Sequence, residues 1–146
     1  MTRVVLDTNV VVSAALNERA GILPLSTPSL CLQLALAGKV SLVVSESLLT
    51  EYEEVMLRPK FSFVPRLVHA LLLDIRRSAH QAIPAKLPAK TVTDPDDAHV
   101  LGCAVAGKAA FLITGNTRHF PERYRGVTVI TPAAFIAWSL AEGLFS

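Results

Sequence analysis

Short apolar runs alternate with longer amphipathic segments along this chain of 146 residues. Apolar runs rich in β-branched side chains predict strands that are buried on both faces. They lie at residues 4–6, 40–44, 110–114 and 127–130. The segments between them have the apolar spacing of helices, which we expect at residues 10–16, 28–37, 46–57, 66–80, 94–106 and 132–140. Alternating strands and helices predict one three-layer α/β/α domain over residues 1–146, with a mainly parallel central sheet.

Capping and breaking residues place the ends of several helices. Thr27 caps the second helix, Pro28 takes its first position and Gly38 closes it. Ser45 caps the third helix and Pro59 stops it. Similar signals open the later helices at Thr93-Asp94-Pro95 and Thr131-Pro132, and Gly107 ends the former. Loops are expected at residues 17–28, 61–65, 81–90 (or an edge strand there) and 115–126, the last with one helical turn.

Two of these helices have apolar faces that bear on packing. In the fourth helix Leu67, Leu71, Leu72 and Ile75 should form the inner face. Trp138, in the last helix, is expected in the core or at an interface.

The composition is that of a folded globular chain. Apolar residues make up 51% and charged residues 18%, and the formal net charge is +2. That charge neither requires nor opposes a nucleic-acid partner. Cys31 and Cys103 lie in apolar helical patterns and are expected as buried thiols of a cytoplasmic protein. No apolar stretch approaches about 18 residues, so we expect neither an export signal nor a membrane span.

An acid follows the first strand directly. Asp7, Thr8 and Asn9 come after the apolar run of residues 4–6. The carboxyl ends of parallel strands are where ligands bind in open α/β sheets. Asp7 therefore has two interpretations, a cap for the next helix or a group that carries chemistry, and the residues alone do not decide between them.

The third helix contains several acids, two of them at the border of its apolar stripe. At about 100° per residue, Glu51 and Glu53 fall on the two borders, whereas Glu46 and Glu54 lie away from it. Geometry does not choose between Glu51 and Glu53.

Asp97 is placed on the inner side of the next acidic helix. It shares a face with Leu101, Ala104 and Val105. Asp94 and Asp96 already suit the capping of that end, so a third acid exceeds what capping needs. A carboxylate on a buried side is costly unless it is paired or binds metal, which favours a ligand role for Asp97 over a cap.

The strand at residues 110–114 ends in Thr114-Gly115-Asn116, the same sequence of apolar strand and oxygen side chains as at Asp7. If the two strands are neighbours, Asp7, Asp97, Thr114 and Asn116 converge. Such oxygen donors, without His or Cys at suitable spacing, favour Mg²⁺ or Mn²⁺ over zinc. Taken alone, Asn116 is more simply the residue of an ordinary turn.

Four motifs together resemble the PIN-domain nucleases. They are Asp7-Thr8-Asn9; Ser45 with Leu48-Leu49-Thr50-Glu51; Asp94-Pro95-Asp96-Asp97 with Leu101 and Ala104; and Leu112-Ile113-Thr114-Gly115-Asn116 with Phe120-Pro121. The resemblance covers nearly the whole chain. More narrowly, the chain resembles the VapC-like ribonuclease toxins of toxin–antitoxin pairs.

The resemblance implies a metal-dependent endoribonuclease and assigns roles to residues. Asp7, Glu51 and Asp97 match the catalytic, metal-binding acids, and this match selects Glu51 over Glu53. The supporting polar positions are matched by Asn9, Ser45 and Thr114. Many members carry Asp where this chain has Asn116, whose amide would hold a second metal less tightly, and Asp94 or Asp96 would then compensate. Otherwise the enzyme would use one metal, or be weak or inactive.

The resemblance also implies a product chemistry and partners. We expect 5′-phosphate and 3′-hydroxyl ends, a small antitoxin that covers the acidic cleft, and a homodimer. Single-stranded RNA is the expected substrate, and the residues expected near its phosphates are Arg118, His119, Arg123 and Arg125. A solvated basic loop is the alternative for these four.

A second possible basic rim consists of Arg58, Lys60 and Arg66. No role is expected for His69 or His80. None is expected for His99 either, because its position in the helix orients it away from Asp97.

Three other functions are alternatives to this nuclease. An aspartyl phosphatase would carry a second acid where this chain has Asn9. A phosphate-accepting signalling domain would have an acid pair in the first loop and a Lys after a late strand, and the sequence has neither. A PIN fold that binds RNA or protein without cleaving it stays open because of Asn116.

Overall fold

The computed structural model describes residues 1–21 and 26–145 of the chain. Its sheet has six strands in the order β3-β2-β1-β4-β6-β5. The strands are β1 (Arg3–Leu6), β2 (Ser41–Val44), β3 (His80–Gln81), β4 (Phe111–Ile113), β5 (Arg123–Tyr124) and β6 (Val127–Ile130). All pairs are parallel except β5 with β6. The predicted fold class is confirmed.

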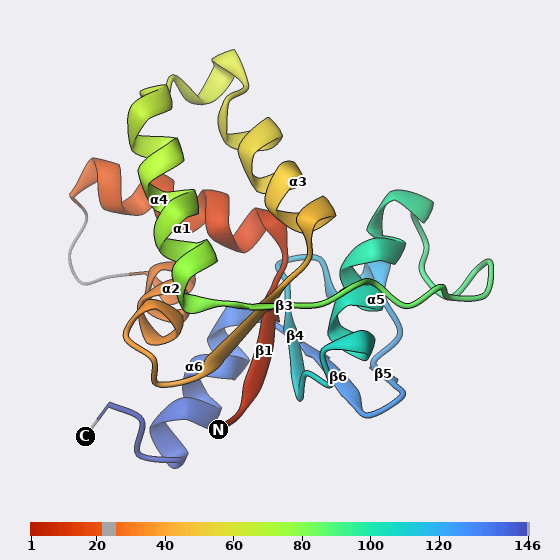
Figure 1. Cartoon of the computed structure of the whole chain (residues 1–146). Helices are drawn as coiled ribbons and strands as arrows, with labels where there is room; N and C mark the ends of the chain where they lie inside the picture. The colour runs from red at the N-terminus through yellow and green to blue at the C-terminus, as the bar shows by residue number, and fades with distance from the viewer. Residues whose placement is uncertain (22–25, 146) are drawn as a thin grey trace.

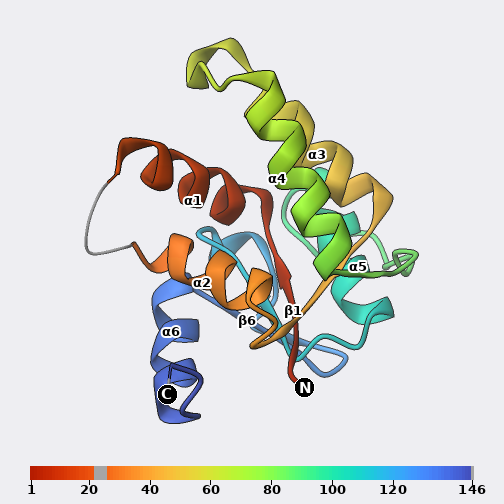
Figure 2. The same ribbon diagram turned by 60° about the vertical axis from the view of Figure 1, so that its left-hand side comes forward.

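Helices cover both faces of this sheet. They are α1 (Thr8–Ala20), α2 (Thr27–Leu36), α3 (Glu46–Met56), α4 (Pro65–Ser78), α5 (Ala98–Ala106) and α6 (Pro132–Ala141). Three short 3-10 turns, at Pro59–Phe61, Pro95–Asp97 and Thr117–His119, complete the elements. Figures 1 and 2 show α2 and α6 on one side of the sheet and α5 on the other. No helix among the described residues is long and apolar enough to span a membrane.

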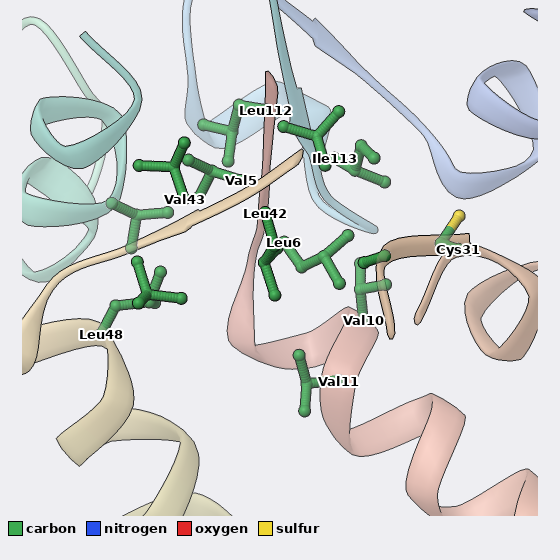
Figure 3. Close-up of a cluster of buried hydrophobic side chains, with 14 of the residues drawn as sticks. Val5, Leu6, Val10, Val11, Cys31, Leu42, Val43, Leu48, Leu112 and Ile113 are labelled. Carbon is green, nitrogen blue, oxygen red and sulfur yellow. The ribbon is translucent and has the colours of Figure 1, made fainter. Parts of the chain in front are cut away.

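The central strands are apolar on both faces because both faces are covered. Val4, Val5 and Leu6 of β1 are fully buried. Figure 3 shows side chains of β1, β2 and β4 in one cluster with residues of α1, α2 and α3. The cysteines are free and buried, as expected, and burial raises the pKa of Cys31 to about 12 and that of Cys103 to about 11.

The first helix is longer than predicted. Residues 17–20, expected in a loop, are helical, and the helix begins at Thr8 rather than Val10. Asp7 accepts a hydrogen bond from the Thr8 N–H, so the chain turns from strand to helix without a linker. Gly21, counted as a loop residue in the sequence, is the left-handed C-cap with φ 65°. The part of the expected loop at residues 22–25 lies outside the described residues.

Smaller corrections concern α2 and α4. The cap of α2 is Ser26 rather than Thr27, because the Ser26 hydroxyl accepts from the Ser29 N–H. In α4 Val68 and Ile75 are buried, whereas Leu67, expected inside, is 60% exposed. Leu71, Leu72 and Ile75 pack inward as predicted, and Val68 takes the place expected for Leu67. The helix ends at Ser78, and the chain beyond it forms the edge strand β3 rather than a last helical turn.

The segment after β3 passes unusually close to α5. A Cβ placed on Gly102 would lie 2.4 Å from the Ala85 carbonyl oxygen, and the Ala85 N–H donates to the Gly102 carbonyl at 3.0 Å. Only glycine permits this approach. It holds α5 against the body of the domain, and α5 begins directly after Asp97.

Candidate metal-binding and catalytic site

A hollow of about 570 Å³ opens beyond the carboxyl end of β1. Its lining includes Asp7, Glu51, Asp97 and Asn116, which come from four separate segments of the chain. Asp7 follows β1, Glu51 lies in α3, and Asp97 lies at the start of α5. β1 and β4 are neighbours in the sheet, as the convergence of Asp7 and Asn116 required.

Asp7 is held rigidly at the base of the hollow. Its side chain is almost fully buried and accepts from the Thr8 N–H at 2.8 Å and from the Thr114 hydroxyl at 2.8 Å. Burial raises the pKa of this carboxyl group, and the negative charges of Asp97 and Glu51 raise it further, against the lowering effect of the two hydrogen bonds. Asp7 thus acts both as the helix cap and as a buried acid of a like-charged cluster.

Thr114, directly after β4, and Asn9, in α1, both lie against the Asp7 carboxylate. Thr114 is fully buried and its Oγ1 accepts from the Asn116 N–H at 3.0 Å. The Asn9 amide oxygen accepts from the Gly115 N–H at 3.0 Å. The loop that carries Asn116 is therefore tied to the loop that carries Asp7.

Glu51 and not Glu53 faces the hollow. Both Glu51 oxygens are bound: one accepts from the Thr8 hydroxyl, and Oε1 lies 3.1 Å from Nε2 of His99. Burial disfavours ionisation of Glu51, but the hydrogen bonds from His99 and Thr8 outweigh burial and lower its pKa. Glu53 is exposed and lies 4.0 Å from His69 of α4. The acid that lines the hollow is thus Glu51, the one that the resemblance selects.

Asp97 does not cap α5. It occupies the cap position but makes no capping hydrogen bond, while Asp94 accepts from the Asp96 N–H to cap the preceding 3-10 turn. The Asp97 carboxylate instead lies 3.3 Å from Nδ1 of His119. Burial and the charge of Asp94 raise its pKa, against the effect of His119. The capping interpretation of Asp97 is excluded by this geometry.

The other predicted site residues divide between lining and support. Asp94 lines the hollow, and Asp96 is exposed and lines a neighbouring one. Ser45 is buried and caps α3 through the Leu48 N–H at 3.1 Å, so it positions the helix that carries Glu51.

Only His119 of the four predicted RNA-binding residues lines the hollow. Arg118 is exposed on the 3-10 turn, and Arg123 and Arg125 lie at β5, the far edge of the sheet, where Arg125 packs over the Tyr124 ring. Their contact with RNA stays a prediction. Arg58 of the second predicted rim does line the hollow, whereas Lys60 and Arg66 do not.

His99 is the residue that sequence reasoning missed. The sequence assigns it no role, whereas the neighbouring α3 brings Glu51 to it. Its contact with Glu51 raises its pKa, against the effect of burial. Its Nδ1 is buried and has no hydrogen-bond partner among the described residues, so Glu51 fixes the ring through Nε2. Only the packing of α3 beside α5, which the sequence does not specify, reveals the pair.

The acids share the hollow but do not form a ready set of ligands. Within residues 1–21 and 26–145, no three His, Cys, Asp or Glu side chains lie close enough together to hold a metal ion. Thr8 and His99 bind Glu51, His119 binds Asp97, and the like charges of the acids repel one another. The donor set itself suits Mg²⁺ or Mn²⁺, because it consists of carboxylate and amide oxygens. Burial raises the pKa of Asp7, and the like charges of Asp97 and Glu51 add to that effect, a repulsion that a cation would relieve.

The fold and the hollow define a class: a parallel α/β domain with acids from separate elements at the carboxyl edge of its sheet. A model of the PIN domain matches residues 3–118, and the chain belongs to the PIN-domain family. A chain in the crystal structure of VapBC2 from Rickettsia felis bound to a DNA fragment from their promoter has a similar fold. Its TM-score is 0.55 and its sequence identity 17%, over 89% of this chain and 98% of that one. A search of curated proteins finds no match.

Proposed function

We propose that this protein is a metal-dependent endoribonuclease whose catalytic acids are Asp7, Glu51 and Asp97. The observation that carries the proposal is that β1, α3 and α5 bring these three side chains to one hollow. Membership of the PIN-domain family supports the reaction class. The buried, like-charged setting of Asp7 is typical of acids that bind a divalent ion.

Asp7, Glu51 and Asp97 would hold the Mg²⁺ or Mn²⁺, with the Asn116 amide oxygen as a weaker, uncharged donor. When bound, the ion activates water for attack on the phosphodiester and neutralises charge on the phosphate. The chain's own residues orient the acids: Thr8 and Thr114 fix Asp7, and His99 fixes Glu51. His119 would have to release Asp97 for it to become a ligand.

We also propose that the chain is a single PIN domain and the toxin of a toxin–antitoxin pair. The similarity of its fold to a chain of VapBC2 supports this role. A small antitoxin protein would be its partner, the protein would act as a homodimer in the cytoplasm, and the antitoxin would cover the acidic hollow.

The second candidate is a PIN domain that binds RNA or protein without cleavage. The uncharged amide of Asn116, which lines the hollow where many family members carry Asp, favours this function. A phosphatase is disfavoured because Asn9, the position of its second acid, binds the Gly115 N–H.

A cleavage assay separates the candidates. End-labelled single-stranded RNA is incubated with the protein in Mg²⁺, in Mn²⁺ and in EDTA, and the new ends are mapped. We expect cleavage with either ion, none in EDTA, restored activity on adding excess Mg²⁺, and 5′-phosphate with 3′-hydroxyl ends. RNA that is bound and left intact under all conditions would instead establish the binding module.

A further inference from the structure

The short segment after α3 forms a basic and aromatic cluster at the lip of the acidic hollow. It includes the 3-10 turn Pro59–Phe61, preceded by Arg58 and followed by Phe63. Arg58 and Phe61 line the same hollow as the three acids. Phe61 is only half-buried, so part of its ring is accessible.

The lining of the hollow is of two chemical kinds. It contains the acids Asp7, Glu51, Asp94 and Asp97, and also the apolar side chains of Val12, Leu16, Val55 and Phe61. Acids alone suit a cation. Apolar side chains in the same hollow suit a ligand that has a flat apolar face next to a phosphate.

The backbone under Phe61 is fixed before any ligand arrives. The Arg19 guanidinium donates to the Phe61 carbonyl oxygen and lies 4.4 Å from the centre of the Phe63 ring. Ser62 adopts a left-handed conformation, φ 52°, and its N–H donates to the Pro59 carbonyl at 3.1 Å. The turn therefore presents Phe61 from a scaffold tied to α1.

The turn that carries this ring also carries two cations. The Lys60 ammonium lies 5.0 Å from the centre of the Phe61 ring, and Arg58, which lines the same hollow as Phe61, has its Nη2 3.7 Å from Glu54 Oε1. Aromatic rings flanked by mobile cations are the means by which proteins bind unpaired nucleotides, with stacking on the bases and charge on the backbone. Lys60 can leave the ring for a phosphate because its side chain is exposed.

We propose that Phe61 stacks an unpaired base of the RNA substrate, while Arg58 and Lys60 bind the adjoining phosphates. The inference rests on the proposed function, which gives RNA as the substrate, and it adds the residues that bind an unpaired base and its phosphates beside the acids. A duplex covers the faces of its bases and would leave Phe61 without a partner. A protein partner on the same lip is the competing occupant.

The test uses Phe61 itself as a reporter. Trp138 is the only tryptophan in the sequence, so Phe61→Trp in a Trp138→Phe background gives a single fluorophore at the stacking position. It is titrated in EDTA with short oligoadenylate or oligouridylate, and with the same oligomers carrying abasic residues. We expect saturable quenching by the intact oligomers and little by the abasic ones. The matched control is Phe145→Trp in the same background, because Phe145 is exposed and lines a different pocket, and it should respond to neither oligomer.

A second measurement does not depend on the tryptophan background. The affinity of the otherwise unaltered protein for labelled oligoadenylate, followed by fluorescence anisotropy in EDTA, should fall about tenfold or more for Phe61→Leu and be retained by Phe61→Trp. In cleavage assays Phe61→Leu should raise KM with little change in kcat. Unfolding curves of both variants confirm that the fold is intact.

The outcomes separate this inference from the proposed function. Quenching and base-dependent binding without any cleavage would support base stacking on Phe61 and refute the proposed nuclease activity. Cleavage that is unaffected by Phe61→Leu, or equal quenching by intact and abasic oligomers, would refute base stacking on Phe61 but would not contradict the proposed nuclease activity. Absence of any response to RNA would also refute base stacking on Phe61, and would favour a protein partner at residues 58–63.

Discussion

Asp7→Asn is expected to lower RNA cleavage by at least about a hundredfold. Loss of groups that only orient metal ligands costs about 10- to 100-fold, so loss of a ligand charge should reach or exceed that range. Asp7 is the most buried of the three acids and is bound by Thr8 and Thr114. The measurement is the initial rate of cleavage of a labelled RNA in Mg²⁺. The control is Asp74→Asn, an exposed acid of α4 away from the hollow, which should cleave at the wild-type rate.

The same variant should unfold at the same temperature as the wild type or a higher one. Burial and the neighbouring acids raise the pKa of Asp7, which means that the folded protein disfavours its charged form. Asparagine removes that charge and keeps an oxygen to accept from the Thr8 N–H. A large fall in the unfolding temperature would show that Asp7 is mainly structural, and the loss of activity would then carry no weight for the proposed chemistry.

Phe135→Ala should destabilise the protein by about 3–5 kcal/mol, a large part of the stability of an ordinary domain. Phe135 is fully buried in α6, where its ring lies 5.6 Å from that of Trp138 and 5.8 Å from that of Phe111 on β4. Chemical denaturation followed by circular dichroism measures the change. The control is Phe145→Ala, whose ring is 44% exposed and which should change stability little.

This result bears on the extent of the domain. The PIN-domain match ends at residue 118, before β6 and α6. Yet β6 pairs with β4, and α6 packs on α2. If the chain is one domain, Phe135→Ala shifts a single transition for the whole protein. Two transitions, with only one of them shifted, would show that the last elements fold separately.

The sequence predicted most of the elements because their signals are local. Apolar runs give the central strands, Ser45 and Thr131 cap their helices as expected, and Pro59 follows the end of α3. The errors also have local causes. Gly21, predicted in a loop, instead closes a longer first helix. For Asp7 the sequence leaves capping and catalysis open, and in the structure Asp7 caps that helix and also lines the hollow.

The sequence predicted a site residue only where the apolar pattern of its own helix or strand fixes which way the residue faces. The spacing placed Asp97 on an inner face, and the structure puts it in the hollow. Glu51 and Glu53 were equivalent by spacing, and only the packing of α3 against α1 and α5 distinguishes them. His99 and Phe61 were missed because each reaches the hollow through contacts between distant segments, for which the sequence carries no periodic pattern.

Manganese binding tests the central claim most directly. Free Mn²⁺ is followed by electron paramagnetic resonance as the wild type, Asp7→Asn, Glu51→Gln and Asp97→Asn are titrated, with Asp74→Asn as the control. We expect the wild type and the control to bind the ion with equal affinity, and each of the three variants to bind it at least about tenfold more weakly. Wild-type protein that leaves Mn²⁺ free, or three variants that bind it as tightly as the wild type, would contradict the account.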